Sequence, residues 1–136
     1  MAAWQADFML VPPSGTLSPD YRARLGEVLP PGNSWSDDIE LWGTEDGDRI
    51  EVSPATDGTV DLWARFDMRA PDSALCERFL SFVRLEELKM CDMAGRPVAP
   101  VLGEFVRALR RSLAFRFVTD PEEFFRRLRI DGLTDG

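Results

Sequence analysis

The chain has 136 residues, of which 44% are hydrophobic and 29% are charged, and its formal net charge is −8. This composition is typical of a globular protein with a sizeable core rather than of a disordered segment. The negative charge argues against a protein that binds nucleic acid through phosphate contacts and against a polybasic membrane anchor.

The hydrophobic patterning and the turn signals divide the chain into alternating strands and helices. In chain order we expect a strand over 4–11, a helix over 19–29, strands over 38–43, 49–53 and 59–68, a helix over 72–87, a strand over 88–93, a helix over 101–112, an extended piece over 113–118 and a helix beginning at 120. The residues after Ile130 are expected to form a flexible tail, within a single domain spanning 1–136.

The segment 59–68 is the clearest of these elements, because it alternates apolar and polar residues without a break. The apolar set is Val60, Leu62, Ala64, Phe66 and Met68, and the polar side carries Thr59, Asp61, Trp63, Arg65 and Asp67. A period of two indicates a strand with one buried face and one hydrated face. We therefore expect a central strand of an antiparallel sheet whose apolar side is covered by helices.

The neighbouring elements carry weaker versions of the same signals. The strand at 38–43 is expected to bury Ile39 and Leu41, which leaves Trp42 on the polar side. Ser18 is expected to cap the first helix.

The helix expected over 72–87 has a strong apolar stripe, formed by Leu75, Cys76, Phe79, Leu80, Phe82 and Val83. A second stripe, in the helix over 101–112, is formed by Val101, Leu102, Phe105, Val106 and Leu109.

This order of elements predicts an α+β fold. The specific expectation is a ferredoxin-like two-layer sandwich, an antiparallel sheet with helices on one face and with helical additions at the C-terminus. The N-terminus lacks a secretory pattern and no stretch is long and apolar enough to span a membrane, so we expect a cytoplasmic protein.

Catalytic chemistry finds little support in the residues. The chain contains no histidine, which removes the commonest general base and metal ligand. It carries no phosphate-binding loop, nucleophile elbow or paired cysteine motif, so we expect no catalytic residue, no metal and no cofactor. Cys76 lies on an apolar stripe and is expected to be a core residue. An enzyme based on paired carboxylates, or a small-ligand binder, stays open as an alternative.

The polar face of the predicted sheet is the candidate site for binding a partner. The residues assigned to it are Trp42, Arg49, Asp61, Trp63, Arg65 and Asp67. Tryptophan and arginine are enriched among residues that dominate interface energetics. Two alternatives remain: the segment from Leu113 onward covers the tryptophans, or arginine neighbours partly cover them as cation–π pairs.

The distribution of charge suggests what kind of partner such a face would take. Residues 1–67 carry 13 acidic and 4 basic residues, a net charge of −9, whereas residues 68–136 carry 11 acidic and 12 basic residues, a net charge of +1. We therefore expect a non-enzymatic protein-binding module, for example an immunity-type inhibitor of a basic toxin or nuclease. The alternative within this class is a homo-oligomeric scaffold or regulatory subunit that pairs through Trp42 and Trp63.

Overall fold

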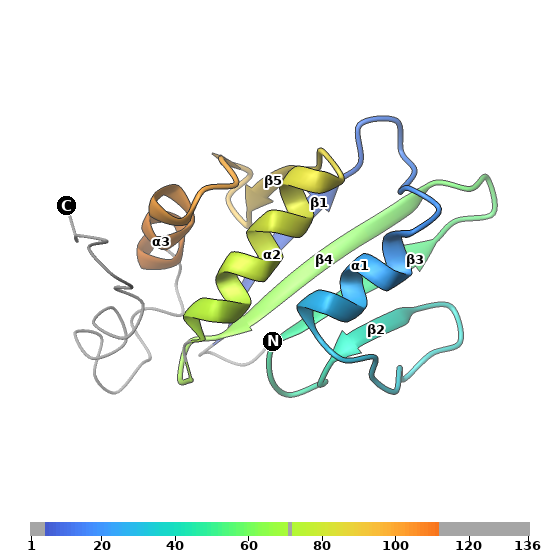
Figure 1. The fold of residues 1–136 in the computed structure, drawn as a ribbon, viewed down its shortest axis with the longest axis horizontal. Helices are drawn as coiled ribbons and strands as arrows, with labels where there is room; N and C mark the ends of the chain where they lie inside the picture. Colours follow the sequence, from blue (N-terminus) through green and yellow to red (C-terminus); the bar gives the residue numbers. More distant parts are fainter. Residues whose placement is uncertain (1–4, 71, 112–136) are drawn as a thin grey trace.

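The computed structural model describes residues 5–70 and 72–111, which form an α+β fold with a six-stranded antiparallel sheet and three helices (Figure 1). The elements in chain order are β1 (Gln5–Val11), α1 (Tyr21–Val28), β2 (Glu40–Gly43), β3 (Arg49–Pro54), β4 (Val60–Asp67), α2 (Ser73–Leu85), β5 (Lys89–Asp92), β6 (Pro97–Val98) and α3 (Leu102–Arg111).

The strands lie in the order β2-β3-β4-β1-β5-β6. Because β4 pairs with β3 on one side and β1 on the other, the prediction of an internal antiparallel strand over 59–68 is confirmed. The ferredoxin-like arrangement is not confirmed, since three consecutive strands separate α1 from α2 and two short strands follow α2. The short strand β6 was not predicted.

One face of the sheet, here called the inner face, belongs to the hydrophobic core. Its strand residues in that core are Ala6, Phe8, Leu10, Trp42, Ile50, Val52, Leu62, Ala64 and Phe66. In Figure 1, α1 and α2 lie side by side in front of the sheet. The helix α3 adds Phe105, whose ring centroid lies 5.0 Å from that of Phe8 and 5.2 Å from that of Phe66. The alternation predicted for residues 59–68 is therefore confirmed in β4.

The helix α2 forms as its sequence indicates. Asp72 caps it, because the Asp72 side chain accepts a hydrogen bond of 3.0 Å from the Leu75 N–H. All six residues of the predicted apolar stripe are buried. The stripe of α3 is confirmed at Phe105, Val106 and Leu109, but Val101 precedes the helix and is 49% exposed.

Ser18 does not cap α1, and this prediction is wrong. The helix begins at Tyr21, after Asp20, and no side chain caps it. The Ser18 hydroxyl instead donates a 2.6 Å hydrogen bond to Glu86, which also accepts from the Ser18 N–H and from Arg24. A hydrogen bond to a carboxylate is stronger than one between two neutral groups. The Ser18 side chain therefore bonds to Glu86 and links the start of α1 to the end of α2.

The strand β2 has the opposite phase from the one predicted. Trp42 pairs with Ile50, lies on the inner face and is 6% exposed, so its assignment to the polar face is wrong. Its ring packs edge-on against Tyr21 at 6.4 Å between centroids. Glu40 also points to the inner side, where it accepts hydrogen bonds from Tyr21 and Arg22 of α1. The register of the β2–β3 hairpin fixes this phase, because it places Trp42 beside a buried partner.

Both edges of the sheet are blunted. At the β2 edge, the Gly32 N–H donates to the Leu41 carbonyl at 2.9 Å, and the Gly43 N–H donates to the Pro30 carbonyl at 2.7 Å. A Cβ at Gly32 would lie 2.4 Å from the Gly43 oxygen, so the close approach requires glycine. At the other edge, β6 is two residues long and begins with Pro97, which has no N–H.

Several predicted features lie outside the described residues. They are Trp4 at the start of the first strand, the extended piece over 113–118, the helix from 120 and the tail after Ile130.

Candidate functional site

The face of the sheet opposite the core, here called the outer face, holds five of the six predicted site residues. They are Arg49, Asp61, Trp63, Arg65 and Asp67. The strand register arranges them in rows that cross the sheet. One row runs Arg49, Arg65, Asp7, and the next runs Glu51, Trp63, Met9, Cys91. The first row is charged, and the second becomes apolar towards β5.

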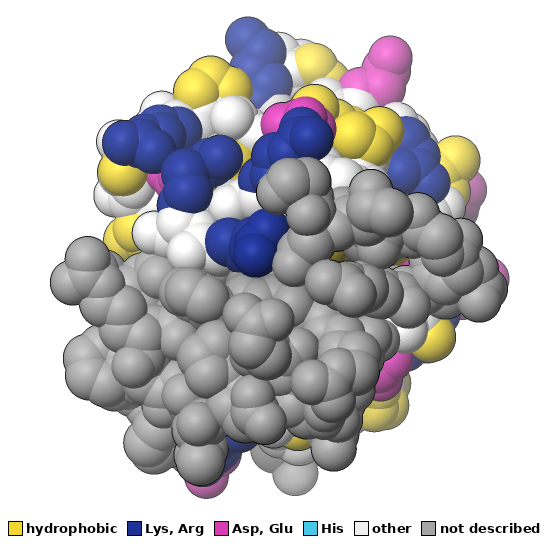
Figure 2. Space-filling view, turned by 90° about the vertical axis from the view of Figure 1, so that its left-hand side faces the viewer, with side chains coloured by type: hydrophobic (Ala, Val, Ile, Leu, Met, Phe, Trp, Pro, Cys, Tyr) yellow, Lys and Arg dark blue, Asp and Glu magenta, His cyan; other side chains and the backbone are white. Residues whose placement is uncertain are grey.

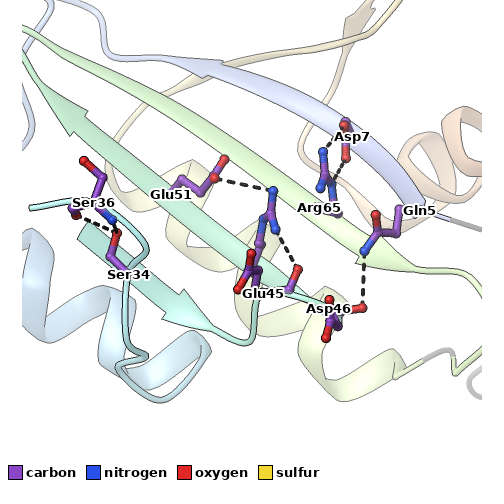
Figure 3. Close-up of polar contacts among 9 residues, drawn as sticks. Gln5, Asp7, Ser34, Ser36, Glu45, Asp46, Glu51 and Arg65 are labelled. Carbon is purple, nitrogen blue, oxygen red and sulfur yellow. Dashed lines mark hydrogen bonds and ion pairs between the residues drawn. The ribbon is translucent and has the colours of Figure 1, made fainter. Parts of the chain in front are cut away.

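An ion pair occupies the middle of the charged row (Figure 3). Arg65 donates two hydrogen bonds to the carboxylate of Asp7, from Nε at 2.6 Å and from Nη2 at 2.9 Å. The Asp7 side chain is 0% exposed and that of Arg65 is 12% exposed. The hydrogen bond to Asp7 raises the pKa of Arg65 above its usual range. Such a covered, bidentate pair holds β1 and β4 in one register.

Arg49 joins three neighbouring segments of the chain. Its Nη1 donates to the Glu45 carbonyl at 2.6 Å, and its Nη2 lies 3.5 Å from the Glu51 carboxylate (Figure 3). The guanidinium carbon lies 4.9 Å from the centroid of the Trp35 ring. The loop before β2, the turn before β3 and the outer face of β3 therefore meet at one buried cation.

Two N–H donors on the outer face have no acceptor in the described part of the chain. They are Nε1 of Trp63 and Nε of Arg49, and both atoms are covered by the surrounding packing. A buried donor without an acceptor costs roughly 1–3 kcal/mol. Sites that keep a buried donor without an acceptor are frequently functional, because their local arrangement is not optimised for stability alone.

The apolar end of the outer face is exposed. Met9 is 40% exposed and Val11 is 49% exposed, although both belong to β1, a strand with a neighbour on each side. Cys91, opposite Met9, is partly buried. Asp61 is exposed, whereas Asp67 forms an ion pair with Arg69 at 2.9 Å. Met9, Val11, Trp63 and Cys91 thus form an apolar strip beside charged residues.

Sequence reasoning missed two members of this surface. Met9 pairs with Trp63 on this face but was not among the predicted site residues, although a large apolar residue among polar neighbours was the available signal. Trp35 lies in the loop between Gly32 and β2, and it is 47% exposed. No periodic pattern marks it, because loops have none, and only its position over Arg49 connects it to this face.

Among the residues that the structure describes, no group of three or more Cys, Asp or Glu side chains is placed to hold a metal ion. Cys76 is buried in the core, and burial raises its pKa to about 12, so its thiol is a poor nucleophile at neutral pH. None of the described helices has the length and apolar character needed to cross a membrane.

Comparison with family models, with curated proteins and with solved structures finds no match to this chain.

Proposed function

We propose that this protein is a binding module that docks a partner protein on the outer face of its sheet. The observation that carries the proposal is the exposed apolar strip on β1 and its neighbours. Met9 and Val11 are large, apolar and 40–49% exposed on an internal strand, beside the indole of Trp63. An apolar centre with aromatic anchors and a charged surround is the usual composition of a protein interface.

The blunted edges support docking on the face rather than on an edge. A partner that adds a strand needs a free row of N–H and C=O groups. At β2 the segment Pro30–Gly32 already takes that row, and at β6 the strand is short and carries Pro97. The core lies on the inner face. The outer face is thus the broad surface on which side chains, rather than backbone groups, would be read by a partner.

The charge of the chain supports a basic partner. The acidic residues are concentrated in residues 1–67, the half that supplies β1 to β4. Opposite charge on a partner would raise the association rate and make binding sensitive to salt. An immunity-type inhibitor that captures a basic toxin or nuclease is one concrete form of this proposal.

The test uses tagged protein to capture partners from a lysate of the native host at low and high salt, with quantification by mass spectrometry. Met9→Glu places a charge in the apolar strip and should reduce recovery of the specific partner at least about tenfold. The matched control is Leu85→Glu, because Leu85 is 60% exposed but lies at the end of α2. Equal recovery by wild type and Met9→Glu would contradict the proposal.

Two further measurements locate the contact. Trp63→Ala should weaken capture more than it lowers the free energy of unfolding, because the indole is only partly buried. Cys91 is a free cysteine in the strip and can report whether the strip is covered. Its alkylation by iodoacetamide should therefore be slower when the partner is bound. Unfolding of the domain by Trp63→Ala would instead identify the indole as core.

Self-association through the same strip is the second candidate, because an apolar face can pair with its own copy. Light scattering decides between the two. A dimer that Met9→Glu converts to a monomer would identify a second copy as the occupant, whereas a monomer at high concentration would exclude it.

A further inference from the structure

A group made of one exposed indole and four exposed carboxylates lies in the loop before β2 and in the turn before β3. It is here called the Trp35 patch and consists of Trp35, Asp37, Asp38, Glu45 and Asp46, all of which are exposed. The two halves of the patch come from the loop before β2 and from the turn before β3. They meet because Arg49 contacts both Trp35 and the Glu45 carbonyl.

Arg49 fixes the position of the indole from below. The guanidinium carbon lies 4.9 Å from the ring centroid, and Arg49 itself is only 9% exposed. Trp35 therefore covers a buried cation with part of its ring, while 47% of the residue remains exposed. A second guanidinium that stacks on the exposed part of the indole is attracted by the ring, and the attraction is stronger when water is excluded from the contact.

The loop that presents Trp35 is preorganised by hydrogen bonds between the residues that flank Trp35 in the sequence, and those between Ser34 and Ser36 are drawn in Figure 3. The Ser34 hydroxyl donates to the Ser36 carbonyl at 2.8 Å and accepts from the Ser36 N–H at 3.1 Å. The Ser36 hydroxyl accepts from the Asp38 N–H at 3.2 Å. An aromatic side chain held in its bound position loses little conformational entropy when a partner docks.

The ion pairs within the described residues involve carboxylates outside the patch, at Asp7, Glu40, Glu51, Asp67, Glu86 and Glu104. Within the patch, the charge of Asp46 interacts with that of Arg69. A second group of exposed cations lies at the far end of the molecule. Figure 2 shows Lys and Arg side chains at the end of the molecule that carries α3, where Arg107 and Arg111 are exposed. That helix contacts β6, at the edge of the sheet opposite β2.

Arg49 adds an independent sign of an incomplete contact. It is nine-tenths buried, and its Nε–H has no acceptor among the described residues. Its other guanidinium nitrogens contact Glu45 and Glu51.

We infer that the Trp35 patch is the specificity element of the binding face, and that it receives an arginine-rich cationic segment of the partner protein. One guanidinium of the partner stacks on the exposed part of Trp35, and neighbouring cations meet Asp37, Asp38, Glu45 and Asp46. Arginine suits this site better than lysine, because its planar group both stacks on indole and binds carboxylates with two donors. This inference rests on the proposed binding function and specifies the chemistry of the partner.

A synthetic arginine decamer is the probe, with a glutamate decamer as the charge control, and binding is measured by calorimetry at low and high salt. Wild type should bind the arginine decamer and not the glutamate decamer. Trp35→Ala should weaken binding of the arginine decamer about tenfold. Trp35→Phe should retain most of the binding, because Phe also provides an aromatic ring for Arg49 and for a guanidinium of the decamer. Asp37→Asn combined with Asp38→Asn should weaken binding and reduce its salt dependence.

The matched control is Glu77→Gln combined with Glu87→Gln, which removes two exposed carboxylates at α2 and just after it. It lowers the net negative charge by the same amount as the Asp37 and Asp38 pair and should leave binding close to wild type. Equal weakening by both pairs would show a response to net charge alone and would overturn the inference. Unchanged binding by Trp35→Ala would also overturn it.

The capture experiment separates this inference from the proposed function. Loss of the partner by Met9→Glu with full recovery by Trp35→Ala would overturn the role of the Trp35 patch and leave the binding face intact. Retention of the partner by both variants would overturn the proposed function as well. A dimer of wild type that Trp35→Ala dissociates would identify the occupant as a second copy and overturn the assignment to a cationic partner.

Discussion

The two faces of the sheet come from the same strands but are stabilised in different ways. In β4, the inner residues Leu62, Ala64 and Phe66 are all at most 6% exposed and lie in the core. The outer residues between them include Trp63, which keeps an unmet N–H donor, and Arg65, which binds Asp7. The inner face is satisfied by non-directional burial, whereas each polar group on the outer face needs a specific partner.

This difference predicts that substitutions on the two faces affect stability in different ways. Apolar residues on the inner face can be exchanged for others of similar volume at small cost. On the outer face, a change of one charged residue leaves its partner uncompensated. We therefore expect substitutions on the two faces to differ in kind, and the following three predictions are ordered by the size of their effect.

The largest effect is expected on the inner side. Phe79 is 0% exposed, and its ring centroid lies 4.9 Å from that of Phe66 and 5.6 Å from that of Phe105. Phe79→Ala should lower the free energy of unfolding by about 3–5 kcal/mol, because it removes apolar contact and leaves a cavity. Urea denaturation followed by circular dichroism measures this change.

Leu85→Ala is the control on the same helix, because Leu85 is 60% exposed. It should change the free energy of unfolding by less than about 0.5 kcal/mol. Similar costs for the two variants would contradict the view that the inner layer dominates stability.

The second effect tests the ion pair of the outer face. Asp7→Asn keeps the shape of the side chain but leaves the Arg65 charge without its partner in a largely covered position. The expected cost is about 3 kcal/mol in the free energy of unfolding. The double variant Asp7→Leu with Arg65→Met removes both charges and should recover most of this loss, as measured in the same denaturation experiment.

An exposed pair provides the comparison for that result. Arg69 pairs with Asp67, but the Arg69 side chain is 50% exposed, so Arg69→Ala should lower the free energy of unfolding far less than Asp7→Asn does. If Asp7→Asn lowers the free energy of unfolding no more than Arg69→Ala does, the buried ion pair contributes no more to stability than the exposed one, and the prediction is wrong.

The smallest effect concerns Asp48, a carboxyl group in the turn before β3. It accepts a 2.7 Å hydrogen bond from the Asp67 N–H. Burial raises its pKa to about 6, and the nearby charges of Asp67 and Asp72 act in the same direction. The folded pKa exceeds the value of about 4 expected in the unfolded chain. The contribution of this group to stability is therefore fully present below pH 4 and is lost as the pH rises through about 6.

Asp48→Asn removes the charge and keeps an oxygen acceptor for the Asp67 N–H. The variant should be more stable than wild type by about 1 kcal/mol at pH 7, a value that allows for solvent screening of a partly exposed group. The advantage should disappear near pH 4. Thermal unfolding of both proteins from pH 4 to pH 7 measures it, and a constant difference across this range would contradict the raised pKa.

Local pattern predicted much of this fold. The alternation of residues 59–68 predicted both faces of β4, and the stripe from Leu75 to Val83 predicted the buried side of α2. Strand and helix periods report which residues share a face without knowledge of neighbours. The same reasoning placed Arg49, Trp63 and Arg65 on one face, which the register confirms.

Local pattern was insufficient where neighbours decide the outcome. In the four-residue strand β2, both Leu41 and Trp42 are large and apolar, so either could have pointed to the core. Its pairing with β3 and its contact with Tyr21 chose Trp42. Ser18 lies just before Pro19, a position suited to a helix cap. Its hydroxyl instead donates a hydrogen bond to the carboxylate of Glu86, which is distant in the chain.

The sequence by itself determined the α+β class, the positions of the main strands and helices, and the two-sided character of the central strands, because these depend on residue periodicity. Only the tertiary structure decided the strand order, the phase of β2, the closing of the edges and the placement of Trp35 over Arg49. These features depend on pairings between residues far apart in the chain, and such pairings leave no periodic mark in a single sequence.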